Sequence, residues 1–103
     1  MNHKGRTTES GTKVLNVLIA LKGHTLTGLS NGELAKALKE SPSTINRCLN
    51  TLIEAGLAIQ LDSGRFAHSV MLLQIAQAYA NDIARTQSRI AELQQRVSAG
   101  ANY

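Results

Sequence analysis

The segment Ser41–Gly56, with the sequence SPSTINRCLNTLIEAG, carries a helix start, a helix stop and two chemically different helix faces. Pro42 disfavours a helical Ser41 but suits the first turn of a helix, so Ser41 is the expected cap. Gly56 is the expected stop, because glycine commonly follows the last turn of a helix. The segment therefore predicts a helix from Pro42 to about Ala55.

Helical spacing divides this predicted helix into two sides. The side expected to face a core is apolar and consists of Ile45, Cys48, Leu49, Leu52 and Ile53. The opposite side is polar, has no acid before Glu54, and consists of Ser43, Thr44, Asn46, Arg47, Asn50 and Thr51. Because Ser, Thr and Asn lower helix propensity, this side favours a role other than helix stability.

Two shorter helices are predicted before this segment. Ser10 or Thr12 is the expected cap of the first, which runs to about Lys22. Its expected buried face consists of Val14, Leu15, Val17, Leu18 and Leu21. The second runs from Asn31 to about Glu40 and starts with a capping box formed by Ser30 and Glu33. Its expected buried residues are Leu34, Ala35 and Leu38.

The periodicity changes after Gly56. Apolar residues recur at Leu57, Ile59 and Leu61, Asp62-Ser63-Gly64 is a turn cluster, and residues 65–68 can return as a second strand. Three helices followed by a hairpin predict a mainly α winged helix-turn-helix over residues 10–68. In that fold the third helix enters the major groove of DNA.

A long helix is predicted over residues 69–98, a range without proline or glycine. Its heptad stripe consists of Leu72, Ala76, Tyr79, Ile83, Thr86, Ile90, Leu93 and Val97, flanked by Asp82, Arg85, Arg89 and Glu92. A helix folded back on its own domain would leave the distal apolar residues uncovered. We therefore expect a homodimer, with parallel and antiparallel pairing both open, and a disordered tail over residues 99–103.

Composition favours an anionic partner. The 103 residues carry 11 Lys and Arg against 7 Asp and Glu, a net charge of +4. With an aromatic content of 3%, platforms for stacking single-stranded bases are not expected, whereas duplex DNA remains open. The N-terminus lacks an apolar signal core and no run is long enough to span a membrane, so we expect a soluble, cytoplasmic protein.

The polar side of the helix starting at Pro42 is suited to reading DNA. Asn pairs with adenine, Arg with guanine or phosphate, and Ser or Thr with several base edges. The alternative is a solvated surface on a winged helix that binds protein. We expect this side to bind double-stranded DNA, with Asn46 and Arg47 as its main contacts.

Residues from about 11 to 79 resemble the DNA-binding domain of IclR-type bacterial transcription regulators. The matching motifs are GTKVLNVLIAL, LTGLSNGELAKAL, PSTINRCLNTLIEAGL, DSGRF and VMLLQIAQAY. The resemblance implies a dimer that binds a palindromic or near-palindromic site. Family members continue into a large effector-sensing domain, for which 103 residues leave no room, so no small-molecule effector is expected.

Three further basic residues are candidate DNA contacts. Arg65 follows Gly64 in the predicted wing and is a candidate phosphate contact, although a turn arginine is often merely exposed. Lys4 and Arg6 belong to a predicted flexible basic arm over residues 1–9. This arm either enters a minor groove or adds only nonspecific attraction.

Catalytic and metal-binding patterns are absent from the sequence. Cys48 is the single cysteine and falls on the apolar side of its helix, which favours a buried hydrophobe over a redox or metal role. His3, His24 and His68 lack metal-ligand spacing. We expect no enzyme activity, no metal and no cofactor.

Together these patterns and the resemblance predict a dimeric, sequence-specific transcriptional regulator of bacterial or phage origin, located in the bacterial cytoplasm or nucleoid, with repression as the default. Two alternatives stay open. One is a DNA-binding protein for replication, partition or packaging of a mobile element, and the other is a protein-interaction winged helix.

Overall fold

The computed structural model describes residues 5–101 and confirms the predicted order of elements. These elements are α1 (Glu9–Ala20), α2 (Asn31–Leu38), α3 (Pro42–Glu54), β1 (Ala58–Gln60), β2 (Phe66–His68) and α4 (Val70–Ala101). The chain divides into two compact units after Leu72. The first unit is a mainly α winged helix-turn-helix, and most of α4 forms the second.

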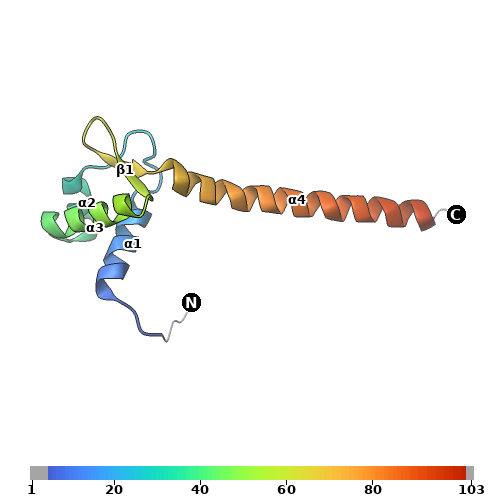
Figure 1. Cartoon of the computed structure of the whole chain (residues 1–103), viewed down its shortest axis with the longest axis horizontal. Coiled ribbons are helices and arrows are strands. Elements are labelled where there is room, and N and C mark those ends of the chain that lie inside the picture. The colour runs from blue at the N-terminus through green and yellow to red at the C-terminus, as the bar shows by residue number, and fades with distance from the viewer. Residues whose placement is uncertain (1–4, 102–103) are drawn as a thin grey trace. The chain divides into compact units, whose positions relative to one another are not determined.

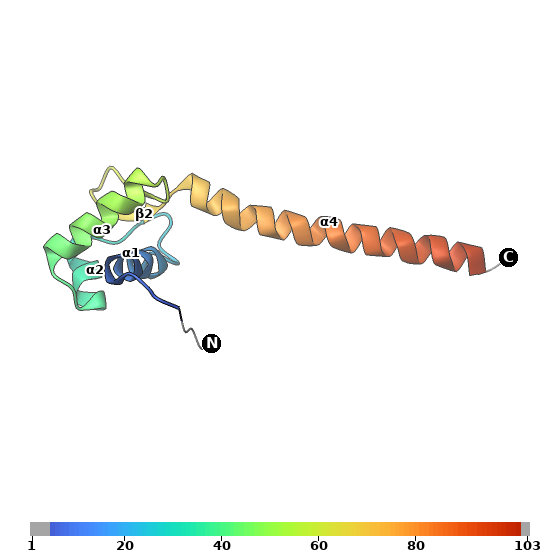
Figure 2. The same ribbon diagram turned by 60° about the horizontal axis from the view of Figure 1, so that its bottom comes forward.

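Helix α3 is the central element of the first unit. It lies beside α1, α2 and the hairpin (Figures 1 and 2). Its inward side chains Ile45, Leu49 and Leu52 are at most 1% exposed, and Cys48 is buried with them. The prediction that Ile53 is also buried is wrong, because this side chain is 38% exposed at the edge of the apolar side.

Helix α1 begins earlier than the sequence predicted. Thr8 is its cap, and the Thr8 side chain accepts a hydrogen bond from the Gly11 backbone N–H at 3.2 Å. The predicted caps Ser10 and Thr12 instead lie inside the helix, and Glu9, which was predicted to belong to the arm, is the first helical residue. The helix also ends earlier, at Ala20, because a turn follows from Leu21 onward.

The predicted buried face of α1 is confirmed in part. Val17 and Leu21 are buried, and Val14 and Leu18 pack against the core. Leu15 was predicted to be buried and is 55% exposed. It lies at the edge of the apolar face, far around α1 from Val17, since two residues correspond to about 200° of helical rotation.

The second helix starts as predicted. The Ser30 hydroxyl accepts a hydrogen bond from the Glu33 N–H, and the Glu33 carboxylate accepts one from the Ser30 N–H, both at 3.1 Å. Leu34 and Ala35 are buried, and Leu38 is half-buried. The helix ends at Leu38 rather than near Glu40, because Lys39 adopts a left-handed conformation with φ of 56°.

The hairpin is confirmed, but its buried residues differ from the predicted alternation. Ala58 is the buried residue of β1, whereas Ile59 is 41% exposed. Strand β2 begins at Phe66 rather than Arg65 and pairs antiparallel with β1, with Ile59 opposite Ala67. A third segment, which no local pattern indicated, joins the hairpin: Leu29 forms a bridge with Phe66 through two backbone hydrogen bonds of 2.8 Å.

Gly28 is required where this third segment meets the hairpin. Its φ is +72°, and a Cβ atom there would lie 2.7 Å from the carbonyl oxygen of Phe66. Any other residue would meet both backbone strain and a steric clash with backbone. Gly28 therefore holds the segment before α2 close to the wing.

Helix α4 is unbroken from Val70 to Ala101, and Ser69 caps its start through a 3.1 Å bond to the Leu72 N–H. The predicted disordered tail is wrong for residues 99–101, which are helical; residues 102–103 lie outside the described range. Gly100 does not end the helix, although a glycine inside a helix costs about 1 kcal/mol relative to alanine. In the described part of the chain, no helix is long and apolar enough to cross a membrane.

The position of Leu49 at the centre of the core predicts a large effect on stability. Leu49 is 0% exposed, so Leu49→Ala should lower the free energy of unfolding by about 2–5 kcal/mol. Urea denaturation at one fixed protein concentration measures this change. Asn50→Ala, one residue along on the exposed side, is the control and should change stability by less than about 0.5 kcal/mol. Equal effects of the two variants would contradict this core.

Candidate nucleic-acid interface

The polar side of α3 is exposed to solvent. Ser43, Asn46, Arg47, Asn50 and Thr51 are exposed, and Thr44 is half-buried. At about 100° of rotation per residue, Ser43, Arg47 and Asn50 lie opposite the core side, while Thr44 and Thr51 share one flank and Asn46 lies on the other. The structure thus brings together six of the nine predicted contacts.

Some of these polar side chains have partners within α3. The Ser41 hydroxyl lies 3.2 Å from that of Ser43 and donates to the Thr44 hydroxyl at 2.9 Å. The Thr51 hydroxyl donates to the Arg47 carbonyl at 2.9 Å. Among residues 5–101, by contrast, no hydrogen bond or ion pair involves the side chains of Asn46, Arg47 or Asn50. These three have their full hydrogen-bonding capacity available for a ligand.

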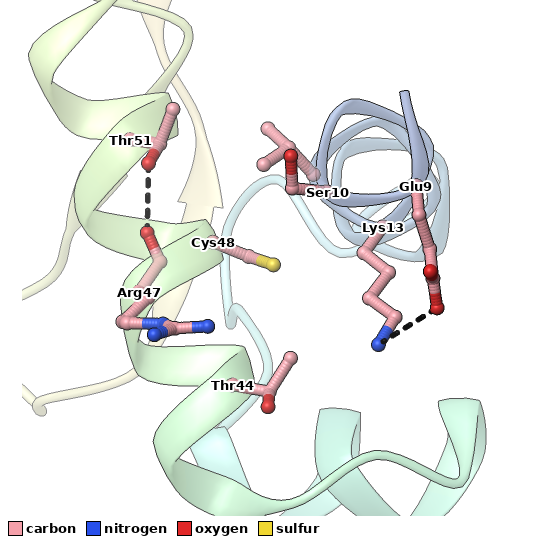
Figure 3. A pocket seen from close by; sticks show the side chains of 8 residues that line it. Glu9, Ser10, Lys13, Thr44, Arg47, Cys48 and Thr51 are labelled. Atoms are coloured by element: carbon pink, nitrogen blue, oxygen red, sulfur yellow. Dashed lines mark hydrogen bonds and ion pairs between the residues drawn. The ribbon is translucent and has the colours of Figure 1, made fainter. Parts of the chain in front are cut away.

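An open groove of about 630 Å³ runs between α1 and α3. Figure 3 shows Thr44, Arg47 and Thr51 on the α3 side of this groove, facing Ser10 and Lys13 on α1. Lys13 forms ion pairs with Glu9 at 3.7 Å and with Glu40 at 3.5 Å. The charge of Lys13 is therefore balanced, whereas that of Arg47 is not balanced within the described residues.

Cys48 lines the same groove, but its thiol is poorly suited to chemistry. Cys48 is 5% exposed and belongs to the core cluster. Burial, with a contribution from Glu40, raises the pKa of its thiol. A protonated thiol is a weak nucleophile, and this agrees with the interpretation of Cys48 as a small buried hydrophobe.

Arg65 is placed differently from the α3 residues. Its guanidinium group donates to the carbonyl oxygens of Thr27 at 3.0 Å and Gly28 at 3.1 Å. It also forms a 2.7 Å ion pair with Glu33, the acid of the α2 capping box. Arg65 thus links the wing to the start of α2, and its predicted contact with phosphate stays a prediction.

The basic residues of the N-terminal arm lie apart from this face or outside the structure. Arg6 is exposed and precedes the α1 cap, while Lys4 falls outside the described residues. Neither predicted contact is tested by the geometry of α3.

The sequence did not indicate two contacts that position α3 and the wing. The Asn31 side chain donates to the Pro42 carbonyl at 3.1 Å and so ties the start of α2 to the start of α3. Arg65 reaches Thr27 across a sequence separation of 38 residues. Spacing along one helix cannot reveal either contact, because both depend on how separate elements pack.

Comparison with known proteins agrees with this geometry. The family model of the IclR helix-turn-helix domain matches residues 11–62, from α1 to the turn after β1. The chain belongs to this family of DNA-binding domains. Residues 63–101 form β2 and α4 rather than an effector-binding domain. A search of curated proteins found no match.

The environment of Glu33 predicts a pH-dependent contribution to stability. Hydrogen bonds from Ser30 and the charge of Arg65 lower the pKa of Glu33 below its ordinary 4.5. The folded state therefore binds fewer protons than the unfolded state, and the stabilisation is complete above pH 4.5 and is lost as pH falls through the lowered value. Between about pH 6 and about pH 3, the wild type should lose more unfolding free energy than Glu33→Gln.

Urea titrations at several pH values measure this difference. Glu54→Gln, which removes an exposed acid at the end of α3, is the matched control. If Glu33→Gln keeps the full acid sensitivity of the wild type, the capping-box and Arg65 contacts do not stabilise the ionised form.

Proposed function

We propose that this protein is a homodimeric transcriptional regulator that binds a specific, near-palindromic site in double-stranded DNA. Helix α3 of each copy enters a major groove, and the bound protein acts by occupying the site. Repression by blocking polymerase is the default outcome of such occupancy, and no small-molecule effector is required.

The exposed side of α3 is the single observation that carries this proposal. Asn46, Arg47 and Asn50 are exposed and have no partner among the described residues. No acidic residue occupies the first turn of α3, where the helix dipole favours anions. Amide and guanidinium groups can form paired hydrogen bonds with adenine and guanine edges. This combination supports sequence-specific reading of DNA over nonspecific attraction alone.

Exposed apolar side chains on α4 support the dimer. No residue of α4 is buried, although it is 32 residues long. Tyr79, Ile83, Ile90, Leu93 and Val97 are between 42% and 71% exposed. A stripe of this length on a single helix marks a surface for another helix, because solvent-exposed apolar area is costly.

Arg47→Ala tests the DNA-reading role. Loss of a base-reading arginine costs about 1–3 kcal/mol, so affinity for the cognate site should fall roughly 5-fold to 150-fold without loss of the fold. The cognate site comes first from selection in a random DNA pool, and a mobility-shift titration then measures affinity. Lys22→Ala removes the same charge from an exposed position outside α3 and is the matched control.

Unchanged affinity of Arg47→Ala, with the wild-type circular dichroism spectrum, would reject α3 as the reading helix. If the selected sequences match replication origins or packaging sites instead of promoters, the protein acts in replication, partition or packaging of a mobile element. Failure to select any sequence would favour a winged helix that binds protein.

The dimer has its own test. Ile83→Asp combined with Ile90→Asp places charges in the stripe, so the double variant should sediment as a monomer where the wild type sediments as a dimer. Thr12→Asp combined with Asn16→Asp adds the same charges to exposed positions of α1 and should leave the dimer intact. A wild type that is monomeric at micromolar concentration would contradict the proposal.

A further inference from the structure

We infer that α4 pairs with α4 of a second copy in antiparallel orientation, in the register that places Ile83 of one copy opposite Thr86 of the other. This inference rests on the proposed homodimer and specifies its geometry. Three properties of α4 carry it: the charges beside the stripe, the charges that other registers would bring together, and the sizes of the stripe residues.

The heptad positions of α4 follow from the four–three spacing of the stripe. Ala76, Ile83, Ile90 and Val97 occupy the first core position of each heptad. Leu72, Tyr79, Thr86 and Leu93 occupy the second. The residues just before the first core position are Ile75, Asp82, Arg89 and Arg96, which flank the seam on one side. Those just after the second are Leu73, Ala80, Gln87 and Gln94, on the other side.

Charge complementarity distinguishes the two orientations. In a parallel pair, residues of the first flank face those of the second flank, so Asp82 and Arg89 both meet glutamines and form no ion pair. In an antiparallel pair, residues of the first flank face one another. In the register proposed here, Asp82 of each copy lies opposite Arg89 of the other, giving two ion pairs related by symmetry.

The same charges select one antiparallel register. A shift by one heptad in one direction keeps an attractive pair, now between Asp82 and Arg96, but places Arg89 opposite Arg89 of the other copy. A shift in the other direction places Asp82 opposite Asp82. Both shifts bring like charges together and leave apolar residues at the ends of the stripe unpaired. The proposed register avoids both costs and pairs all eight stripe residues.

The core residues also fit this register by size. It packs Ala76 against Leu93, Thr86 against Ile83, and Tyr79 against Ile90 of the other copy. Each small or polar residue thus faces a large aliphatic one, which keeps the layers evenly filled. A parallel pair would instead place Ala76 against Ala76, Tyr79 against Tyr79 and Thr86 against Thr86. In that pair the alanine layer would be underpacked, the tyrosine layer would be crowded, and the threonine layer would place two hydroxyl groups in the core.

Cysteine cross-linking tests the orientation in the full chain. In the proposed register Ala76→Cys in one copy lies opposite Leu93→Cys in another. Two copies of the same variant place their cysteines 17 residues apart along the axis, about 25 Å at 1.5 Å per residue, far beyond disulfide reach. Disulfides should therefore form when differently tagged variants are mixed and oxidised, and neither variant alone should cross-link. The wild type is the control for Cys48, which is buried.

Each outcome separates this inference from the dimer itself. Cross-linking of each variant with itself would establish parallel pairing and overturn the inference while leaving the dimer. If the variants sediment as dimers but no cross-link forms even in the mixed sample, α4 does not pair in this register. If the wild type and both variants sediment as monomers, the proposed dimer and the inference both fail.

Charge reversal provides a second test. Asp82→Arg should weaken the dimer roughly tenfold, because two attractive pairs become two repulsive ones, and adding Arg89→Asp should restore it. Asp82 also forms a 3.2 Å ion pair with Arg85 of the same helix, outside the proposed seam. Arg85→Asp removes this pair alone and is therefore the control. Dissociation constants from sedimentation measure the effect. No restoration in the double variant would overturn the register.

Discussion

Burial of one side of α3 is the constraint on which the rest of the DNA-binding domain depends. Ile45, Cys48, Leu49 and Leu52 are packed against α1, α2 and the hairpin, so the helix cannot rotate without exposing them. Side chains about half a turn away are held in solvent by the same packing. The side chains on the exposed side of α3 are therefore not constrained by this packing.

A second constraint fixes the wing relative to the helices. Arg65 contacts the carbonyls of Thr27 and Gly28 and the carboxylate of Glu33, while Leu29 pairs with Phe66 through the backbone. These contacts use the one cationic side chain of the wing, and the exposed turn beside it contains Asp62. The charge of Arg65 is therefore already paired within the fold, whereas that of Arg47 on α3 has no partner among residues 5–101.

Local patterns predicted the elements well, and failures occurred where distant elements meet. The capping box at Ser30 and the cap at Ser41 depend on residues within one turn, so sequence alone located both. The Leu29 bridge and the role of Arg65 depend on contacts between segments more than 30 residues apart, which no local spacing encodes. Ile53 and Leu15 were misplaced because each lies at the edge of an apolar face, where neighbouring elements decide burial. For the predicted site, spacing located the polar side chains on the outward side of α3 but not their hydrogen-bond partners.

The orientation of α4 decides where the DNA-binding domains are attached in a dimer. A parallel pair would attach both at the same end, about 8–10 Å apart across the helix pair. The antiparallel register pairs Leu72 of one copy with Val97 of the other, so the two Leu72 positions are 25 residues apart along the axis, about 37 Å. Half-sites on one face of B-DNA recur about every 34–36 Å. In the proposed antiparallel dimer, the 32-residue helix would therefore separate the two attachment points by a distance close to this repeat.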